Sequence, residues 1–166
     1  MKRILTVLLL TALPALAELK LPGLFSDGMV LQRDTSARVW GWTEPNAPVK
    51  LTFAGEDHGT RADQNGDWKF ELKGLEASAK GSDLVVEAAG SKKVIKDVLV
   101  GEVWLASGKS NMEWRVSGSA NAKEETARAN DPLLRVFVSA NVAESRPQKD
   151  WQGNWKSTQP QNTGSF

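Results

Sequence analysis

The chain changes character along the stretch DVLVGEVWLASGKSNMEW, residues 97–114. Residues 102–106 within it are mostly apolar, which is typical of a parallel strand covered on both faces. Gly108 allows a tight turn after that strand, and Ser110 stands where a helix is expected to begin. A strand, a glycine turn and a helix start in this order can present a serine hydroxyl as a nucleophile.

A helix start also suits the chemistry that such a serine would perform. Backbone N–H groups there are unpaired and point in one direction, and the helix dipole favours an anion. The pattern therefore predicts a nucleophile at Ser110, in a turn that includes Gly108, Lys109 and Asn111. A serine hydroxyl additionally needs a base within hydrogen-bond reach.

The same residues admit a purely structural interpretation. Ser110-Asn-Met-Glu113 matches the capping box, in which the serine side chain bonds the third helical N–H and the glutamate bonds back. A serine in that position needs no catalytic role. Spacing alone favours the cap over the nucleophile.

Residues 18–100, upstream of the decisive stretch, predict a β-sandwich. Short apolar or alternating runs recur at strand length with turn residues between them, a pattern typical of that fold. Asn65-Gly66 is a hairpin turn signal, because both residues tolerate a positive φ. The predicted strands are residues 28–32, 37–42, 48–53, 67–72, 83–88 and 92–99.

Residues 101–166 predict the beginning of an α/β domain. Residues 122–129 indicate a helix, which Asp131-Pro132 ends, and residues 133–138 form a second buried strand. With residues 102–106 they make one right-handed β-α-β unit, whereas residues 139–166 are polar and loop-like. One such unit cannot close a core, so we expect a truncated doubly wound domain.

Residues 1–17 have the pattern of a signal peptide. A basic start at Lys2 and Arg3 precedes an apolar run that is too short to span a bilayer comfortably, and Ala15-Leu-Ala17 is a small-residue cleavage pattern. We therefore expect a mature chain that begins at Glu18, is exported to the periplasm or the extracellular space, and is not held in a membrane.

Composition excludes several kinds of function. The chain has no cysteine, which rules out disulfides and cysteine-based metal sites. Removing residues 1–17 removes two basic residues and no acidic one, so the net charge falls from +1 to −1. No stripe of Lys or Arg remains, so the sequence gives nucleic-acid binding no electrostatic support.

The motifs together resemble the sialate O-acetylesterase family of SGNH (GDSL-like) hydrolases, whose hydrolase domain is a flavodoxin-like α/β fold. The resemblance implies that Ser110 attacks an acetyl ester on sialic acid or a related acetylated sugar. It also implies that the Ser110 backbone N–H helps to hold the oxyanion, with no metal or organic cofactor. The similar segments are GEVWL (101–105), GKSNMEW (108–114), LFSDGMVLQR (24–33), VWGW (39–42) and ADQNGDW (62–68).

The chain departs from that family in two respects. Lys109 stands where the family usually has glutamine, and lysine donates hydrogen bonds but cannot accept them. The family's D-x-x-H block and its later oxyanion glycine and asparagine are not found within these residues. His58, the one histidine, is expected in a solvated turn. We therefore predict that this chain alone is inactive.

A second interpretation involves no catalysis. Trp40, Trp42 and Trp68 could make the β-sandwich a glycan-binding module, with Ser110 acting only as a helix cap. Large aromatic side chains more often fill cores, so each tryptophan taken singly favours burial.

Overall fold

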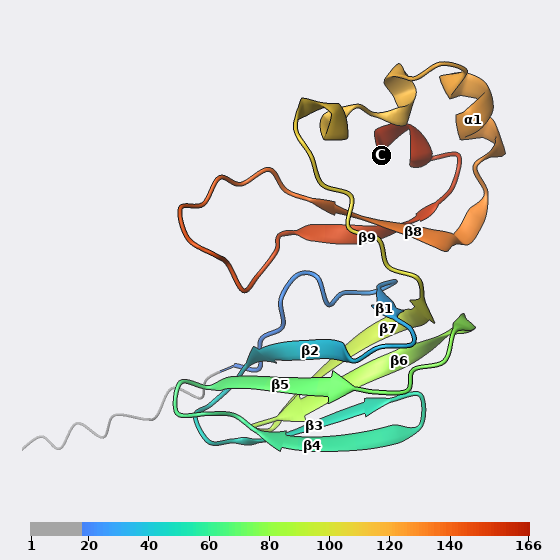
Figure 1. Cartoon of the computed structure of the whole chain (residues 1–166). Helices are drawn as coiled ribbons and strands as arrows, with labels where there is room; N and C mark the ends of the chain where they lie inside the picture. Colours follow the sequence, from blue (N-terminus) through green and yellow to red (C-terminus); the bar gives the residue numbers. More distant parts are fainter. Residues whose placement is uncertain (1–17) are drawn as a thin grey trace, which may run out of the picture.

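The computed structural model describes residues 18–166, and the predicted signal peptide lies outside the described residues. The described chain is mostly β-structure (Figure 1). No helix within residues 18–166 has the length and apolar character needed to cross a membrane.

Residues 18–101 form a two-sheet unit (Figure 1). The larger sheet has the strand order β1-β7-β6-β3-β4, and the smaller sheet pairs β2 with β5 in antiparallel fashion. The larger sheet consists of β1 (Val30–Gln32), β3 (Pro48–Phe53), β4 (Glu56–Arg61), β6 (Ser78–Ala88) and β7 (Ser91–Gly101), and the smaller of β2 (Ala37–Trp42) and β5 (Asp67–Leu72).

One hydrophobic core lies between the two sheets. Alternate residues of β3 and of β5 are buried there, as the period-two pattern predicts. Each fully buried side chain of this size contributes about 1.5–3 kcal/mol to folding. These core residues are Val49, Leu51 and Phe53 from β3 and Trp68, Phe70 and Leu72 from β5.

Two predictions within the two-sheet unit are wrong. The expected solvated turn around His58 is part of strand β4, whose mostly exposed residues lack apolar alternation. Asn65-Gly66 forms a turn, with Gly66 at φ +85°, but not a hairpin. The turn carries the chain from β4 in one sheet to β5 in the other, because β5 takes β2 as its partner.

Residues 102–166 form a second unit above the β1 edge of the first (Figure 1). The predicted helix is confirmed as α1, and the residues expected to be loop-like include a strand, β9. Its elements are the 3₁₀ turns η1 (Ser110–Glu113), η2 (Val116–Gly118) and η3 (Thr163–Ser165), helix α1 (Ala122–Arg128), and strands β8 (Asp131–Ser139) and β9 (Gly153–Thr158).

The second unit differs from the predicted β-α-β arrangement. Residues 102–106 are not a strand, because the Val103 N–H donates to the Gln32 side chain at 2.7 Å instead of to a neighbouring strand. Strand β8 pairs antiparallel with β9. Its residues Leu133 and Leu134 are exposed, so β8 is not the buried strand that its apolar sequence predicts.

Candidate active site

Ser110 is the first residue of η1, on the exposed segment that leaves β7. Backbone hydrogen bonds close both ends of this turn: the Met112 N–H donates to the Lys109 carbonyl at 2.8 Å, and the Trp114 N–H donates to the Asn111 carbonyl at 3.3 Å. The predicted helix start is therefore present, but as one 3₁₀ turn and not as an α-helix. Its contribution to anion binding through a helix dipole is correspondingly small.

The capping box does not form at this turn. Glu113 instead accepts a hydrogen bond from Asn141 Nδ2 at 2.8 Å, and no side-chain cap closes the start of η1. Within residues 18–166 the Ser110 hydroxyl has no hydrogen-bond partner, and Gly108, Lys109 and Asn111 beside it are exposed. The hydroxyl is therefore available for chemistry.

Gly108 has a packing role in the turn. A Cβ at this position would lie 2.7 Å from Cγ of Met112, so a larger residue would displace that side chain. Glycine thus permits the close approach of the residues before and after Ser110, as the sequence predicts.

The structure does not bring His58 to Ser110. His58 lies on β4, the edge strand farthest from β1 in the larger sheet, whereas Ser110 belongs to the second unit (Figure 1). The His58 Nε2 is 3.8 Å from the Glu56 carboxylate, and its ring meets Phe70 edge-on. Among residues 18–166 no group of three or more acidic or histidine side chains could hold a metal ion.

Comparison with known proteins identifies relatives. No family model matches the chain. Mouse sialate O-acetylesterase is 29% identical over 133 residues, which is 74% of this chain and 24% of the mouse protein. The crystal structure of a carbohydrate acetylesterase from Xanthomonas citri superposes with a TM-score of 0.85 and 39% identity, covering 90% of this chain and 34% of that one. The chain is similar to these acetylesterases over most of its own length.

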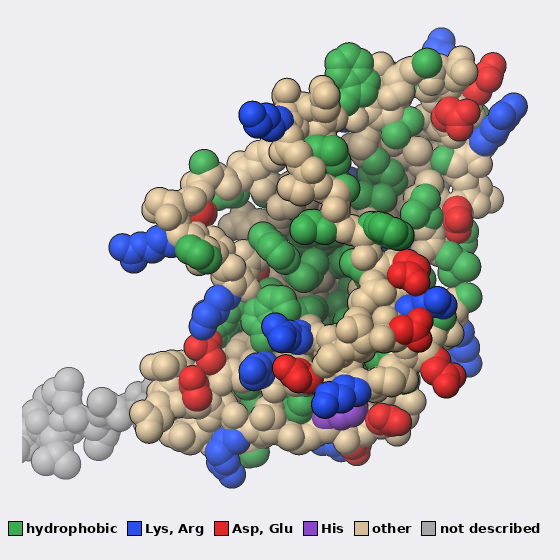
Figure 2. Space-filling model, viewed as in Figure 1, with side chains coloured by type: hydrophobic (Ala, Val, Ile, Leu, Met, Phe, Trp, Pro, Cys, Tyr) green, Lys and Arg blue, Asp and Glu red, His purple; other side chains and the backbone are tan. Residues whose placement is uncertain are grey.

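The esterase-like chain spans between a quarter and about a third of the length of these relatives. Its second unit exposes many large hydrophobic side chains. Figure 2 shows hydrophobic side chains gathered in the hollow where the two units meet. Trp104 and Leu105 are 86% and 90% exposed. The other exposed large hydrophobic residues of this unit are Val103, Met112, Trp114, Leu133, Leu134, Val138, Val142 and Trp151.

Two of the three tryptophans considered for glycan binding, Trp40 and Trp68, make structural contacts. Trp68 is 4% exposed and belongs to the core. Trp40 meets Phe25 edge-on at 4.7 Å and donates its indole N–H to the Lys149 carbonyl of the second unit at 3.0 Å. Trp68 therefore gives a sugar no stacking surface, because its ring is buried, whereas Trp40 and Trp42 are half-buried.

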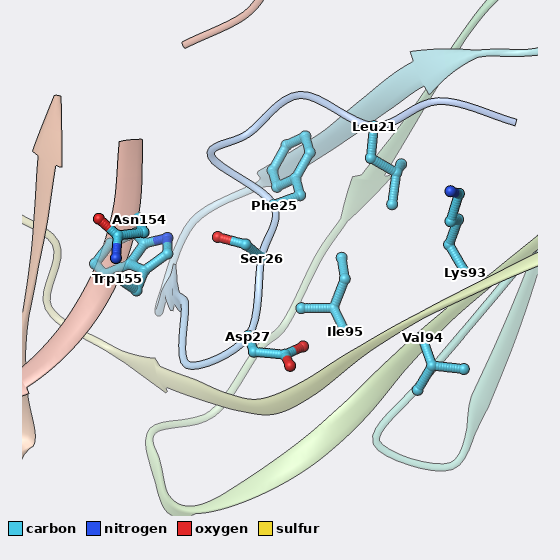
Figure 3. A pocket seen from close by; sticks show the side chains of 9 residues that line it. All are labelled: Leu21, Phe25, Ser26, Asp27, Lys93, Val94, Ile95, Asn154 and Trp155. Carbon is cyan, nitrogen blue, oxygen red and sulfur yellow. The ribbon is translucent and has the colours of Figure 1, made fainter. Parts of the chain in front are cut away.

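A pocket of about 540 Å³ lies apart from the Ser110 turn, between the two-sheet unit and β9. Figure 3 shows Asn154 and Trp155 on one side and Leu21 and Lys93 on the other. Internal hydrogen bonds occupy its central polar groups: the Ser26 hydroxyl donates to the Gly23 carbonyl, and the Asp27 carboxylate accepts from the Lys96 N–H. None of the predicted site residues lines this pocket.

Proposed function

We propose that this chain is part of a serine carbohydrate esterase that removes O-acetyl groups from sialic acid or related acetylated sugars, with Ser110 as its nucleophile. The observation that carries the proposal is the exposed Ser110 hydroxyl, which forms no cap at its own turn. The two acetylesterase relatives support the substrate class.

The proposed reaction begins with attack of the Ser110 oxygen on the acetyl carbonyl carbon. The bond between the acetyl carbon and the sugar oxygen then breaks, the sugar oxygen leaves as a hydroxyl with the proton that the Ser110 hydroxyl gives up, and the acetyl group remains on Ser110. Water next attacks this acetyl-enzyme and releases acetate. Within residues 18–166 the Ser110 N–H donates to no backbone carbonyl, so it can stabilise the oxyanion of each step.

We further propose that residues 18–100 correspond to a β-sandwich domain and residues 101–166 to the first part of an SGNH-type hydrolase domain. The exposed Trp104, Leu105 and Trp114 support this division, since a complete domain would bury such side chains. The remainder of that domain would supply the histidine base and further oxyanion donors. Without them the 166 residues alone give no useful turnover, because loss of a catalytic triad member leaves only residual rate enhancement.

A chimera tests the assignment of the nucleophile. The chain replaces the matching third of the Xanthomonas citri acetylesterase, and acetate release from O-acetylated sugars is measured. We expect the chimera to release acetate, the Ser110→Ala chimera to be inactive, and the free chain to be inactive.

Ser107→Ala is the matched control, because Ser107 precedes Ser110 by three residues on the same exposed segment. This variant is expected to retain the activity of the chimera, which shows that the grafted segment is folded. Full acetate release by the Ser110→Ala chimera would refute the proposal.

We also propose that the chain is exported, from the basic start and apolar run of residues 1–17. N-terminal sequencing of the protein recovered from the periplasm or medium of an expressing bacterium tests this. A mature end at Glu18 is expected, and a cytoplasmic product that retains Met1 would contradict it.

A further inference from the structure

The Ser110 turn has one contact from a distant side chain that the proposed chemistry does not use. Asn141, two residues beyond the end of β8, donates from Nδ2 to Glu113 Oε1 at 2.8 Å. Glu113 is the last residue of η1, the same four-residue turn that begins with Ser110. The bond therefore joins the nucleophile turn to a residue 28 positions away in sequence.

Asn141 is itself held by the β8–β9 pair. The Ala140 N–H donates to the Gln152 carbonyl at 2.8 Å, which fixes the backbone next to Asn141. Earlier in β8, Arg135 Nη1 donates to the Gly28 and Asp97 carbonyls of the two-sheet unit at 2.9 and 2.7 Å. Strand β8 thus has one anchor on the two-sheet unit and another, through Asn141, on the turn.

The contact matters because the turn has little other support. Every residue of η1 is exposed, and the backbone hydrogen bonds that join η1 to its flanking residues are those of the Met112 and Trp114 N–H groups. A hydrogen bond to a carboxylate is stronger than one between neutral groups. Loss of the Asn141 amide would therefore remove the side-chain hydrogen bond that holds the turn in place relative to β8.

We propose that Asn141 is a positioning residue for Ser110: its amide holds Glu113 and thereby sets the place of the nucleophile turn against β8. This proposal rests on the proposed function, since only a catalytic Ser110 requires a fixed position. Asn141 touches neither the reacting atoms nor Ser110 itself and acts through Glu113.

The test uses NMR on the intact chain, with amide exchange at Met112 and Trp114 and the heteronuclear NOE of Ser110 as readouts. Asn141→Ala is expected to accelerate exchange at both amides about tenfold and to lower the Ser110 NOE. Amides of β6 and β7 should not change. Asn154→Ala is the matched control, because Asn154 is an exposed asparagine of β9 that lines the separate pocket.

Variants that restore the bond separate positioning from a general loss of structure. Glu113→Gln keeps an acceptor for Asn141 and is expected to retain slow exchange, whereas Glu113→Ala should match Asn141→Ala. Asn141→Asp places two carboxylates together and should loosen the turn further. The double variant Glu113→Gln/Asn141→Asp reverses donor and acceptor and is expected to restore slow exchange.

Unchanged exchange in Asn141→Ala, an equal effect of Asn154→Ala, or failure of the double variant to recover would each overturn the proposal. Ser110→Ala is expected to leave the exchange rates as they are, so this readout does not depend on catalysis. If the Ser110→Ala chimera still releases acetate, the proposed function is refuted. The effect of Asn141→Ala on amide exchange in the turn would be unaffected by that result.

Discussion

Arg135 Nη2 lies 2.8 Å from Asp97 Oδ2, with 8% of the Arg135 side chain exposed and 60% of the Asp97 side chain exposed. The guanidinium is thus withdrawn from water while its partner remains solvated. Asp97 adopts a left-handed backbone, φ +56°, and offers Arg135 both its carboxylate and its carbonyl. This pair ties β8 of the second unit to the two-sheet unit.

Arg135→Ala is expected to destabilise the protein by about 2–3 kcal/mol, because it removes several charge-assisted hydrogen bonds and leaves the Pro132, Gly28 and Asp97 carbonyls without this donor. Urea unfolding measures the loss. Arg38→Ala is the control: its pair with Glu71 is longer, 3.6 Å, and both side chains are exposed, so it should cost less than about 1 kcal/mol. Equal losses in the two variants would contradict the role of Arg135.

Gly41→Ala is expected to destabilise the two-sheet unit by about 1–3 kcal/mol or more, as overpacking does. A Cβ on Gly41 would collide with the Lys20 carbonyl oxygen and lie 2.5 Å from Cζ2 of the Trp68 ring, which is paired with Gly41 near the end of the β2–β5 ladder. Gly59 on β4 has nothing within 4 Å of such a Cβ, so Gly59→Ala is the matched control. Thermal unfolding checks both, and a normal melting temperature for Gly41→Ala would show that β2 can move aside.

The exposed Trp104 and Leu105 are expected to make the purified chain bind a hydrophobic dye such as ANS. Trp104→Ser/Leu105→Ser should lower the fluorescence enhancement at least twofold without lowering the melting temperature, because neither side chain is buried. Val94→Ser, at a less exposed site on the two-sheet unit, serves as control. Dye binding that survives the double change would place the apolar surface elsewhere.

Asp57→Asn is expected to reduce stability at pH 7 and to leave it unchanged near pH 2. The hydrogen bond from Lys50, followed by that from Thr52, lowers the pKa of the Asp57 carboxyl. A pKa that is lowered in the folded state stabilises the protein at pH values above the ordinary pKa of about 3.9. This stabilisation is lost as the pH falls through the pKa of the folded state.

Urea midpoints measured from pH 7 to pH 2 test the Asp57 prediction. Asp83→Asn on β6 is the control, because Asp83 forms no ion pair with any residue in 18–166. A constant difference between Asp57→Asn and the parent across this pH range would show that ionisation of Asp57 is not linked to folding.

The sequence alone determined those elements that neighbouring residues specify through their spacing and composition. Strands β3 and β5 could be predicted because apolar and polar residues alternate along each of them. This alternation places the apolar side chains on one face of the strand, and that face is buried in the structure. Residues 122–128 form a helix from their own composition, and the turn at Ser110 follows from its glycine and serine spacing. The resemblance to acetylesterases was likewise readable from those motifs.

Tertiary structure alone decided which strands pair and whether Ser110 closes a cap at its own turn. Strands β4 and β9 have no apolar alternation and exist because a neighbouring strand offers its backbone hydrogen bonds. Ser110 closes no cap in the folded chain, and the Glu113 carboxylate that a capping box would use accepts a hydrogen bond from the distant Asn141 instead. Contacts between residues far apart in sequence leave no local pattern, because their energy arises only after the chain has folded.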